Sequence, residues 1–339
     1  MNIRKKDGSI DFKKLLIQSG LYLVLFLMLV LIVAKEPSFL SIRNFKNIIT
    51  QSSVRAIIAL GVAGLIVTQG TDLSAGRQVG LAAVISATLL QASTNVNKVL
   101  DIGELPVIVA ILVVIVVGMI IGSINGLIVA KLNVHPFIAT LGMMTIVYGM
   151  NSLYYDSVGK ASPISGFSEA YSNFAQGTIG SGSFSISYLI IYAAIATAIM
   201  WVLWNKTKFG KNVFAVGGNP EAAKVSGVNV TRTLVGIYAL SGIYYAFGGL
   251  LEAGRIGSAT NNLGNMYEMD AIAACVIGGV SFYGGVGKIS GIITGVIILQ
   301  VINYGLTYVG VSPYWQYIIK GIIIVAAVAF DSIKYAKKK

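Results

Sequence analysis

The residue types that carry most metal and nucleophile chemistry are almost absent from this sequence. It contains one histidine, His135, directly before a proline, and one cysteine, Cys275, inside an apolar run. One histidine and one cysteine cannot build a disulfide framework or a Cys/His metal site. We therefore expect Cys275 to be a small buried residue, and we expect no cofactor on this chain.

Nucleotide chemistry also lacks its usual motif. The phosphate-binding pattern G-x-x-x-x-G-K-[ST] needs a hydroxyl residue after the lysine, but the sequence reads Gly210-Lys211-Asn212 and Gly287-Lys288-Ile289. No H-E-x-x-H occurs, and no serine or cysteine nucleophile can be assigned a histidine base. The sequence predicts a protein that is not an enzyme, so any ATP hydrolysis that drives it would take place on another chain.

One polar stretch, "GGNPEAAKVSGVN" at 217–229, has the pattern of a short capped helix. Asn219 is an N-cap residue, Pro220 suits the first helical position, Glu221 falls in the first turn, and Gly227 is a helix terminator. The pattern predicts a two-turn helix on the cytoplasmic face, with an Ala-rich surface small enough to dock into a groove on a partner. An ordinary, well-capped surface loop is the alternative.

Membrane helices must position these residues, because the chain of 339 residues is 55% hydrophobic and only 11% charged. A membrane-spanning helix needs about 20 apolar residues. Such runs cover 15–34, 54–70, 73–92, 105–130, 137–155, 186–205, 231–251, 269–283, 286–309 and 313–331. The sequence predicts an all-α integral membrane protein with about ten transmembrane helices, or about eight or nine if the short ones are re-entrant.

The distribution of basic residues predicts the orientation, because Lys and Arg accumulate in cytoplasmic segments. They cluster in the N-terminus at 1–14, near the capped segment at 217–230, and in the tail at 332–339. We expect all three segments to be cytoplasmic, around a single transmembrane domain at 15–331.

One basic group disagrees with this topology. Lys35, Arg43, Lys46 and Arg55 flank a loop that the count of spans places outside, so we expect part of 37–50 to be an interfacial helix. The net charge of +12 is an orientation signal, and no basic and aromatic residues interleave as a nucleic-acid site would require.

Glycines recur at helical spacing within the spans. Gly118, Gly122 and Gly126 form one small-residue face, and Gly291 and Gly295 form another. Such faces let helix backbones approach closely in lipid. We expect them to serve packing within the chain, with contact between two copies as the alternative.

Two glycine-broken polar stretches, at 69–78 and 278–288, interrupt the apolar pattern. Aligning Gly70 with Gly279 also pairs Gly76 with Gly285, which indicates a short internal repeat. Broken helices at matching places in two halves of a transporter often mark its pathway. The alternative is a pair of short loops at the membrane face, with Asp72 and Arg77 solvated or paired with each other.

Other polar groups lie outside these breaks. A belt at 252–270 joins two spans and is expected outside, where its amides, hydroxyls and carboxylates suit a polyhydroxyl solute or a docking partner. Lys320 falls inside the last span, where a charge suggests a functional site unless the side chain extends to the interface. The Ser- and Gly-rich region 156–187 is expected to be an outside loop to which an extracytoplasmic partner could bind.

Several stretches resemble a known family. They are 49–55, "IALGVAGLIVTQGTDLSAGRQVGLAA" (58–83), "YGMNSLYYD" (148–156), "ASPISGF" (161–167), "LWNKTKFGKNVFAVGGNPEAAKVSGVNV" (203–230), "LEAGRIGSATNNLG" (251–264) and 312–321. With these runs, the whole chain resembles the permease subunits of ABC sugar importers of the ribose/galactose type, and most of all those for galactose and methyl galactosides.

The resemblance implies a bacterial inner-membrane subunit, with both termini cytoplasmic, that is surrounded by lipid and pairs with a second copy of itself. Its partners would be a cytoplasmic ATP-binding subunit, which carries the ATP and Mg²⁺, and an extracytoplasmic galactose-binding protein. The resemblance also implies an ATPase-coupling segment, which comprises Gly217, Gly218, Asn219, Pro220, Glu221, Ala222, Ala223, Lys224 and Gly227.

The solute pathway is not carried over from the family, because the binding protein would supply most of the sugar specificity. Our candidate pathway or gate residues are Gln69, Asp72, Ser74, Asn261, Asn262 and Asn303. Two alternatives for the function stay open. One is a permease for ribose or another sugar, and the other is an ion-driven secondary transporter whose coupling groups would be Asp72, Glu252, Asp270 and Lys320.

Overall fold

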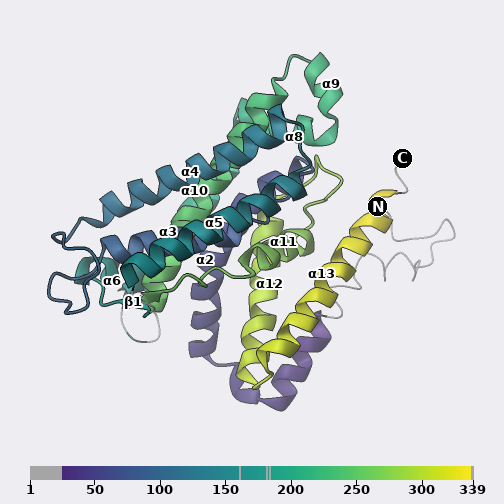
Figure 1. Ribbon diagram of the computed structural model, residues 1–339. Helices are drawn as coiled ribbons and strands as arrows, with labels where there is room; N and C mark the ends of the chain where they lie inside the picture. The colour runs from purple at the N-terminus through teal and green to yellow at the C-terminus, as the bar shows by residue number, and fades with distance from the viewer. Residues whose placement is uncertain (1–24, 160–161, 181, 183–184, 337–339) are drawn as a thin grey trace.

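The computed structural model describes residues 25–159, 162–180, 182 and 185–336, and most of them lie in helices (Figure 1). Seven of the described helices are long and apolar enough to cross a bilayer. They are α2 (Ile42–Val67), α4 (Val107–Lys131), α5 (Pro136–Gly159), α7 (Tyr188–Lys206), α10 (Val230–Ile256), α12 (Ile289–Tyr308) and α13 (Pro313–Ala336). The expected all-helical membrane fold is confirmed.

The expected count of ten spans is not confirmed. The predicted spans 73–92 and 269–283 correspond to α3 (Ala75–Leu89) and α11 (Tyr267–Ile277), which have 15 and 11 residues. At about 1.5 Å per residue, neither can cross a hydrocarbon core of about 30 Å. Of the predicted first span, 15–34, the structure describes only the helix Leu25–Lys35.

The segment 37–50, in which an interfacial helix is expected, forms the entry into α2. A short 3₁₀ helix, η1 (Pro37–Phe39), precedes Ser41, whose Oγ accepts a hydrogen bond from Asn44 N at 3.3 Å. From this N-cap, α2 runs without a break to Val67. Residues 42–50 therefore form the first turns of the same helix as the rest of α2 rather than a separate helix.

Close glycine contacts hold the helix core together. A Cβ atom on Gly118 would collide with the carbonyl oxygen of Gly242, and one on Gly122 with that of Tyr238, both on α10. On α12, Gly291 and Gly295 contact backbone atoms of α11 and its C-terminal end in the same way. Packing within the chain, the expected role of these glycine faces, is confirmed.

Cys275 and the helix α6 (Glu169–Gln176) both contact the helix core. Cys275 on α11 is fully buried, as expected, and its thiol donates to Ala59 O at 3.3 Å. The region 156–187, expected to be an outside loop, contains α6, whose buried Tyr171 donates its hydroxyl to Leu250 O at 2.5 Å. α6 therefore packs on the helix core.

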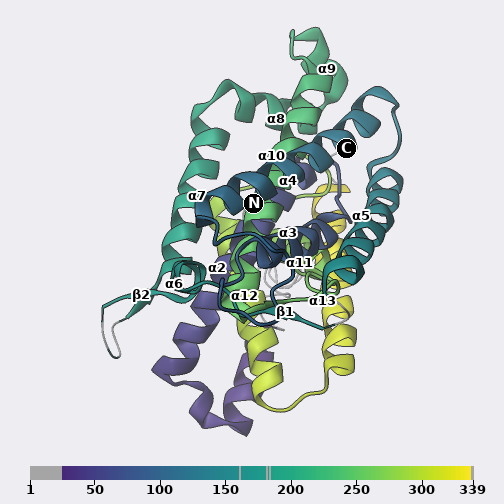
Figure 2. The same cartoon turned by 60° about the vertical axis from the view of Figure 1, so that its left-hand side comes forward.

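Four short strands form two antiparallel pairs among the described residues. β1 (Ile164–Ser165) pairs antiparallel with β4 (Ser258–Ala259), with Ile164 opposite Ala259. β2 (Thr178–Ile179) pairs antiparallel with β3 (Ile186–Ser187). Figure 2 shows α9 (Pro220–Val225) at the top of the molecule and β1, β2 and α6 in its lower half.

The C-terminal part of α13 belongs to the α9 end. Asp331 accepts hydrogen bonds from Ser281 Oγ at 3.0 Å and Phe282 N at 3.1 Å. The same loop continues to Gly285, which contacts the end of α8 (Lys208–Gly218), the helix that leads into α9. The basic N-terminus at 1–14 and the last three residues of the tail, 337–339, lie outside the described residues.

Candidate functional site

The capped segment forms the helix that its sequence predicts. Asn219 Oδ1 accepts a hydrogen bond from Ala222 N at 3.0 Å, and Pro220 occupies the first helical position of α9. Gly227 ends the segment in the left-handed conformation, with φ of 81°. Gly217 and Gly218 lie in the last turn of α8, an amphipathic helix that the sequence reasoning missed.

Most of α9 projects away from the helix core. Glu221, Ala222 and Lys224 are exposed, whereas Ala223 is buried and anchors the helix. Val225 at its end is 89% exposed. The exposed face of α9 therefore combines a carboxylate, an ammonium and an apolar tip.

Gln69, a candidate pathway residue, lies beneath this segment. Its Nε2 donates a hydrogen bond to Gly217 O at 2.7 Å across 148 residues of sequence. The structure thus joins one candidate pathway residue to the candidate coupling segment, and Gln69 does not join the other pathway candidates.

Asp72 and Ser74 are completely buried between α2 and α3. Ser74 N and Ser74 Oγ both donate to Asp72 Oδ1, at 2.9 and 2.5 Å. The partners of Arg77 are different residues. Its Nη2 donates to Asn265 Oδ1 at 2.8 Å, and its guanidinium lies 4.2 Å from the centre of the Tyr148 ring. The alternative in which Asp72 is solvated or paired with Arg77 is therefore wrong.

Two amide residues that the sequence reasoning missed complete this buried cluster. Gln78 Nε2 and Asn125 Nδ2 both donate to Ser74 Oγ, at 2.9 and 3.1 Å. Asp72 Oδ2 and the amide oxygens Gln78 Oε1 and Asn125 Oδ1 are buried without a hydrogen-bond partner. Amides that interrupt apolar runs are the signal that could have revealed these two residues.

Asn261 and Asn262 lie at the opposite end from α9. Asn261 Nδ2 donates to Ser152 Oγ at 3.3 Å, and Asn261 O accepts from Asn151 Nδ2 at 3.2 Å. Asn262 lines a cavity of about 330 Å³ together with Thr260, Asn265 and Tyr267. Asn262 is thus the more accessible of the two.

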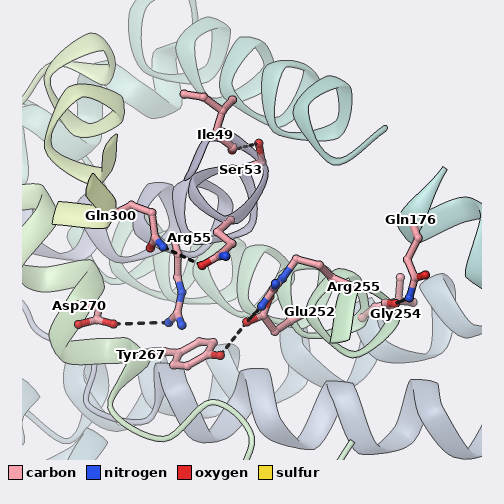
Figure 3. Close-up of polar contacts among 12 residues, drawn as sticks. Ile49, Ser53, Arg55, Gln176, Glu252, Gly254, Arg255, Tyr267, Asp270 and Gln300 are labelled. Carbon is pink, nitrogen blue, oxygen red and sulfur yellow. Dashed lines mark hydrogen bonds and ion pairs between the residues drawn. The ribbon is translucent and has the colours of Figure 1, made fainter. Parts of the chain in front are cut away.

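Figure 3 shows a series of polar contacts among Arg255, Glu252, Tyr267, Arg55 and Asp270. Arg255 holds the buried carboxylate of Glu252 through two bonds of 2.8 and 3.0 Å. Tyr267 donates its hydroxyl to the same carboxylate at 2.7 Å. The guanidinium of Arg55 lies 3.2 Å from the centre of the Tyr267 ring, so α2, α10 and α11 meet through these four side chains.

Asp270 continues this series of contacts to α13. Arg55 Nη1 lies 3.6 Å from Asp270 Oδ2, and Lys320 Nζ lies 2.9 Å from Asp270 Oδ1. Lys320 is therefore paired inside the protein. Asn303 lines the adjacent narrow cavity with Gln300, and its Oδ1 is buried without a partner.

The six candidate pathway residues thus occupy four separate places. Gln69 lies at the α8 junction, Asp72 and Ser74 lie in a buried cluster, Asn261 and Asn262 lie at the far end, and Asn303 lies beside Asp270. They do not line one continuous path in this conformation.

The pairing of Asp270 predicts unequal effects of two substitutions. Lys320→Met leaves Asp270 beside Arg55 and is expected to lower the free energy of unfolding by about 1 kcal/mol. Asp270→Asn leaves two cations facing each other and is expected to lower it by about 3 kcal/mol. Thermal unfolding of the detergent-solubilised chain measures both losses, and equal losses would contradict the shared ion pair.

The two helix breaks share one structural device. After α2 and after α11, the third residue past the helix donates a hydrogen bond back across the last turn. The bonds are Gly70 N to Leu65 O at 2.8 Å and Val280 N to Cys275 O at 2.9 Å. The residue directly before the donor takes the left-handed conformation in both, Gln69 with φ of 62° and Gly279 with φ of 83°. The equivalent positions are therefore one residue away from the expected alignment.

Comparisons with known proteins give a consistent picture. A family model described as the branched-chain amino acid transport system permease component matches residues 44–328. The chain is 67% identical over 340 residues, covering all of both chains, to the "Galactose/methyl galactoside import permease protein MglC" of Haemophilus influenzae. It is 68% identical to the protein of the same name from Escherichia coli, covering 97% of this chain and 98% of that one.

More distant relatives carry another name. The chain is 38% identical to the "Ribose import permease protein RbsC" of Bacillus subtilis, covering 98% of each chain. No solved structure matches the chain.

Proposed function

Because the chain belongs to the family of branched-chain amino acid transport system permease components, we propose that it is the membrane-spanning permease subunit of an ATP-driven importer for galactose and methyl galactosides. It is a multi-pass membrane protein and a transport component. The observation that carries the choice of sugar is the full-length identity to galactose permeases, which is well above the identity to ribose permeases.

The segment formed by α8 and α9 is the proposed docking site for a cytoplasmic ATP-binding subunit. Its position at one extreme of the molecule and the exposed Glu221, Lys224 and Val225 support this role (Figure 1). A short helix held by a cap at each end can pass on a displacement as a rigid unit, because its backbone bonds resist bending. ATP and Mg²⁺ would bind to that partner.

The remaining partners follow from the same proposal. An extracytoplasmic galactose-binding protein would deliver the sugar, and a second copy of the chain would complete the permease. If α9 faces the cytoplasm, then the C-terminal part of α13 also does, since Asp331 bonds the loop that adjoins α8. This supports a cytoplasmic C-terminus in the bacterial inner membrane.

Ion-driven transport is the weaker alternative. Of the four charged residues that could couple an ion gradient, Glu252, Asp270 and Lys320 take part in ion pairs within the chain. A coupling carboxylate must exchange its ion during the cycle, whereas Glu252 is held by Arg255 of the same helix and Asp270 is held by Lys320 of α13. The paired charges therefore favour a structural role for these three residues.

The test is ATP hydrolysis in liposomes that hold this chain with its ATP-binding subunit. Galactose-loaded binding protein is expected to stimulate hydrolysis and to drive galactose accumulation, and a ribose-loaded ribose-binding protein serves as the control. Galactose uptake that follows an ion gradient without the ATP-binding subunit would refute the proposal.

A further inference from the structure

Three segments meet at the base of α8. Gly285 N, in the loop between α11 and α12, donates a hydrogen bond to Val67 O at the end of α2, at 2.8 Å. Gly217 of α8 fits against both, because a Cβ atom there would collide with Val67 O and lie 2.8 Å from Gly285 N. Contacts between backbones leave little freedom for one segment to move without the others.

Gln69 adds the side-chain contact of this junction. Gly217 lies in the last turn of α8, where helix carbonyls lack partners within the helix. The Gln69 side chain supplies one, since its Nε2 lies 2.7 Å from Gly217 O. The end of α8 is thus capped from the break between α2 and α3.

The backbone at Gln69 indicates that its side chain has a specific role. Gln69 holds the left-handed conformation, with φ of 62°, which a non-glycine residue adopts at a cost. The equivalent position after α11 is Gly279, which adopts the same conformation without that cost. A glutamine in this position is explained by the bond that its amide makes.

The junction leads directly into the buried break. From Gln69 the chain passes through Asp72 to α3, and Leu73 N is fixed to Thr140 Oγ1 at 3.2 Å. A displacement of α8 would reach this break through the Gln69 amide as well as through the close contact between Gly217 and Val67.

We propose that Gln69 is a positioning residue of the transport cycle, which makes the break between α2 and α3 move together with α8 and α9. This inference rests on the proposed docking of an ATP-binding subunit on α9. It assigns Gln69 to the transmission of movement rather than to contact with the solute.

The test compares two Gln→Asn variants. Gln69→Asn keeps an amide and tolerates the left-handed backbone, but its side chain is one methylene too short to reach Gly217 O. Gln176→Asn is the matched control, because Gln176 Nε2 makes the same kind of bond to Gly254 O, at 2.8 Å, on the other side of the fold. Gln69→Asn is expected to lower the galactose transported per ATP hydrolysed by about fivefold, with basal hydrolysis kept, and Gln176→Asn to leave it unchanged.

A second measurement needs no transport. Hydrogen exchange of the isolated chain in detergent is expected to become faster in both 68–76 and 210–218 when Gln69 is replaced, and in neither when Gln176 is replaced. An unchanged transport ratio with faster exchange at 68–76 alone would overturn the inference. A complex without stimulated hydrolysis would refute only the proposed function, and the exchange measurement would still decide whether Gln69 links the two segments.

Discussion

Gly118→Leu is expected to keep the chain from reaching its folded state, with a loss of at least about 3 kcal/mol in the free energy of unfolding. The reason is steric, because a Cβ atom on Gly118 collides with the carbonyl oxygen of Gly242. The obstacle is the backbone of α10, which cannot turn aside as a flexible side chain would. Separating α4 from α10 would also remove the close packing that holds these two helices together in lipid.

The matched control is Gly142→Leu on α5, where a Cβ atom would meet no heavy atom within 4 Å. Both substitutions add the same apolar volume to a membrane helix, so they differ only in what that volume meets. The yield of monodisperse protein in detergent and its thermal unfolding measure the effect. Similar behaviour of the two variants would show that α4 and α10 do not pack as closely as the structure places them.

The sequence predicts the fold class because apolar runs long enough to span a bilayer admit few alternatives. It does not predict the number of spans, because hydropathy does not distinguish helices that face lipid from helices that are buried in protein. α3 and α11 are apolar because they lie inside the fold, where α10 and α12 cover them. The break at Gln69 precedes the start of α3, and the break at Gly279 follows the end of α11. These breaks are the sequence signal that the two helices are too short to span the bilayer.

The capped helix α9 is predictable because its determinants are local. Asn219, Pro220 and Gly227 each act within one turn of their own position. α8 was missed because its three glycines resemble a loop, whereas its apolar positions Val213 and Val216 are buried against the rest of the fold. Only the tertiary contacts show that the glycines serve close packing.

The polar clusters could not be predicted because their partners come from distant parts of the chain. Asp72 and Arg77 are close in sequence but point to different partners, since α3 begins between them at Ala75. Lys320 meets Asp270 across 50 residues. Sequence reasoning identified these charges as unusual in a membrane, but it could not determine which charges neutralise one another.

Two adjacent glycines in α8 are expected to respond to alanine with opposite signs. Helix propensity alone favours alanine over glycine by about 1 kcal/mol, so both Gly217→Ala and Gly218→Ala would stabilise an isolated helix. At Gly218 a Cβ atom meets nothing within 4 Å, whereas at Gly217 it collides with Val67 O. Overpacking against a fixed backbone costs about 1–3 kcal/mol or more, so at Gly217 the collision outweighs the propensity.

Gly217→Ala is therefore expected to lower the thermal stability of the purified chain, and Gly218→Ala to leave it equal or slightly higher. If α8 transmits movement from the ATP-binding subunit, Gly217→Ala should also reduce ATP-driven galactose uptake by at least about tenfold, because it pushes α8 away from Val67 and breaks the Gln69 bond. Uptake in liposomes and thermal unfolding, measured on the same preparations, separate the two effects. If Gly217→Ala stabilised the chain as propensity predicts, then α8 would not rest on the end of α2, and the path from α9 into the membrane helices would have to run through other contacts.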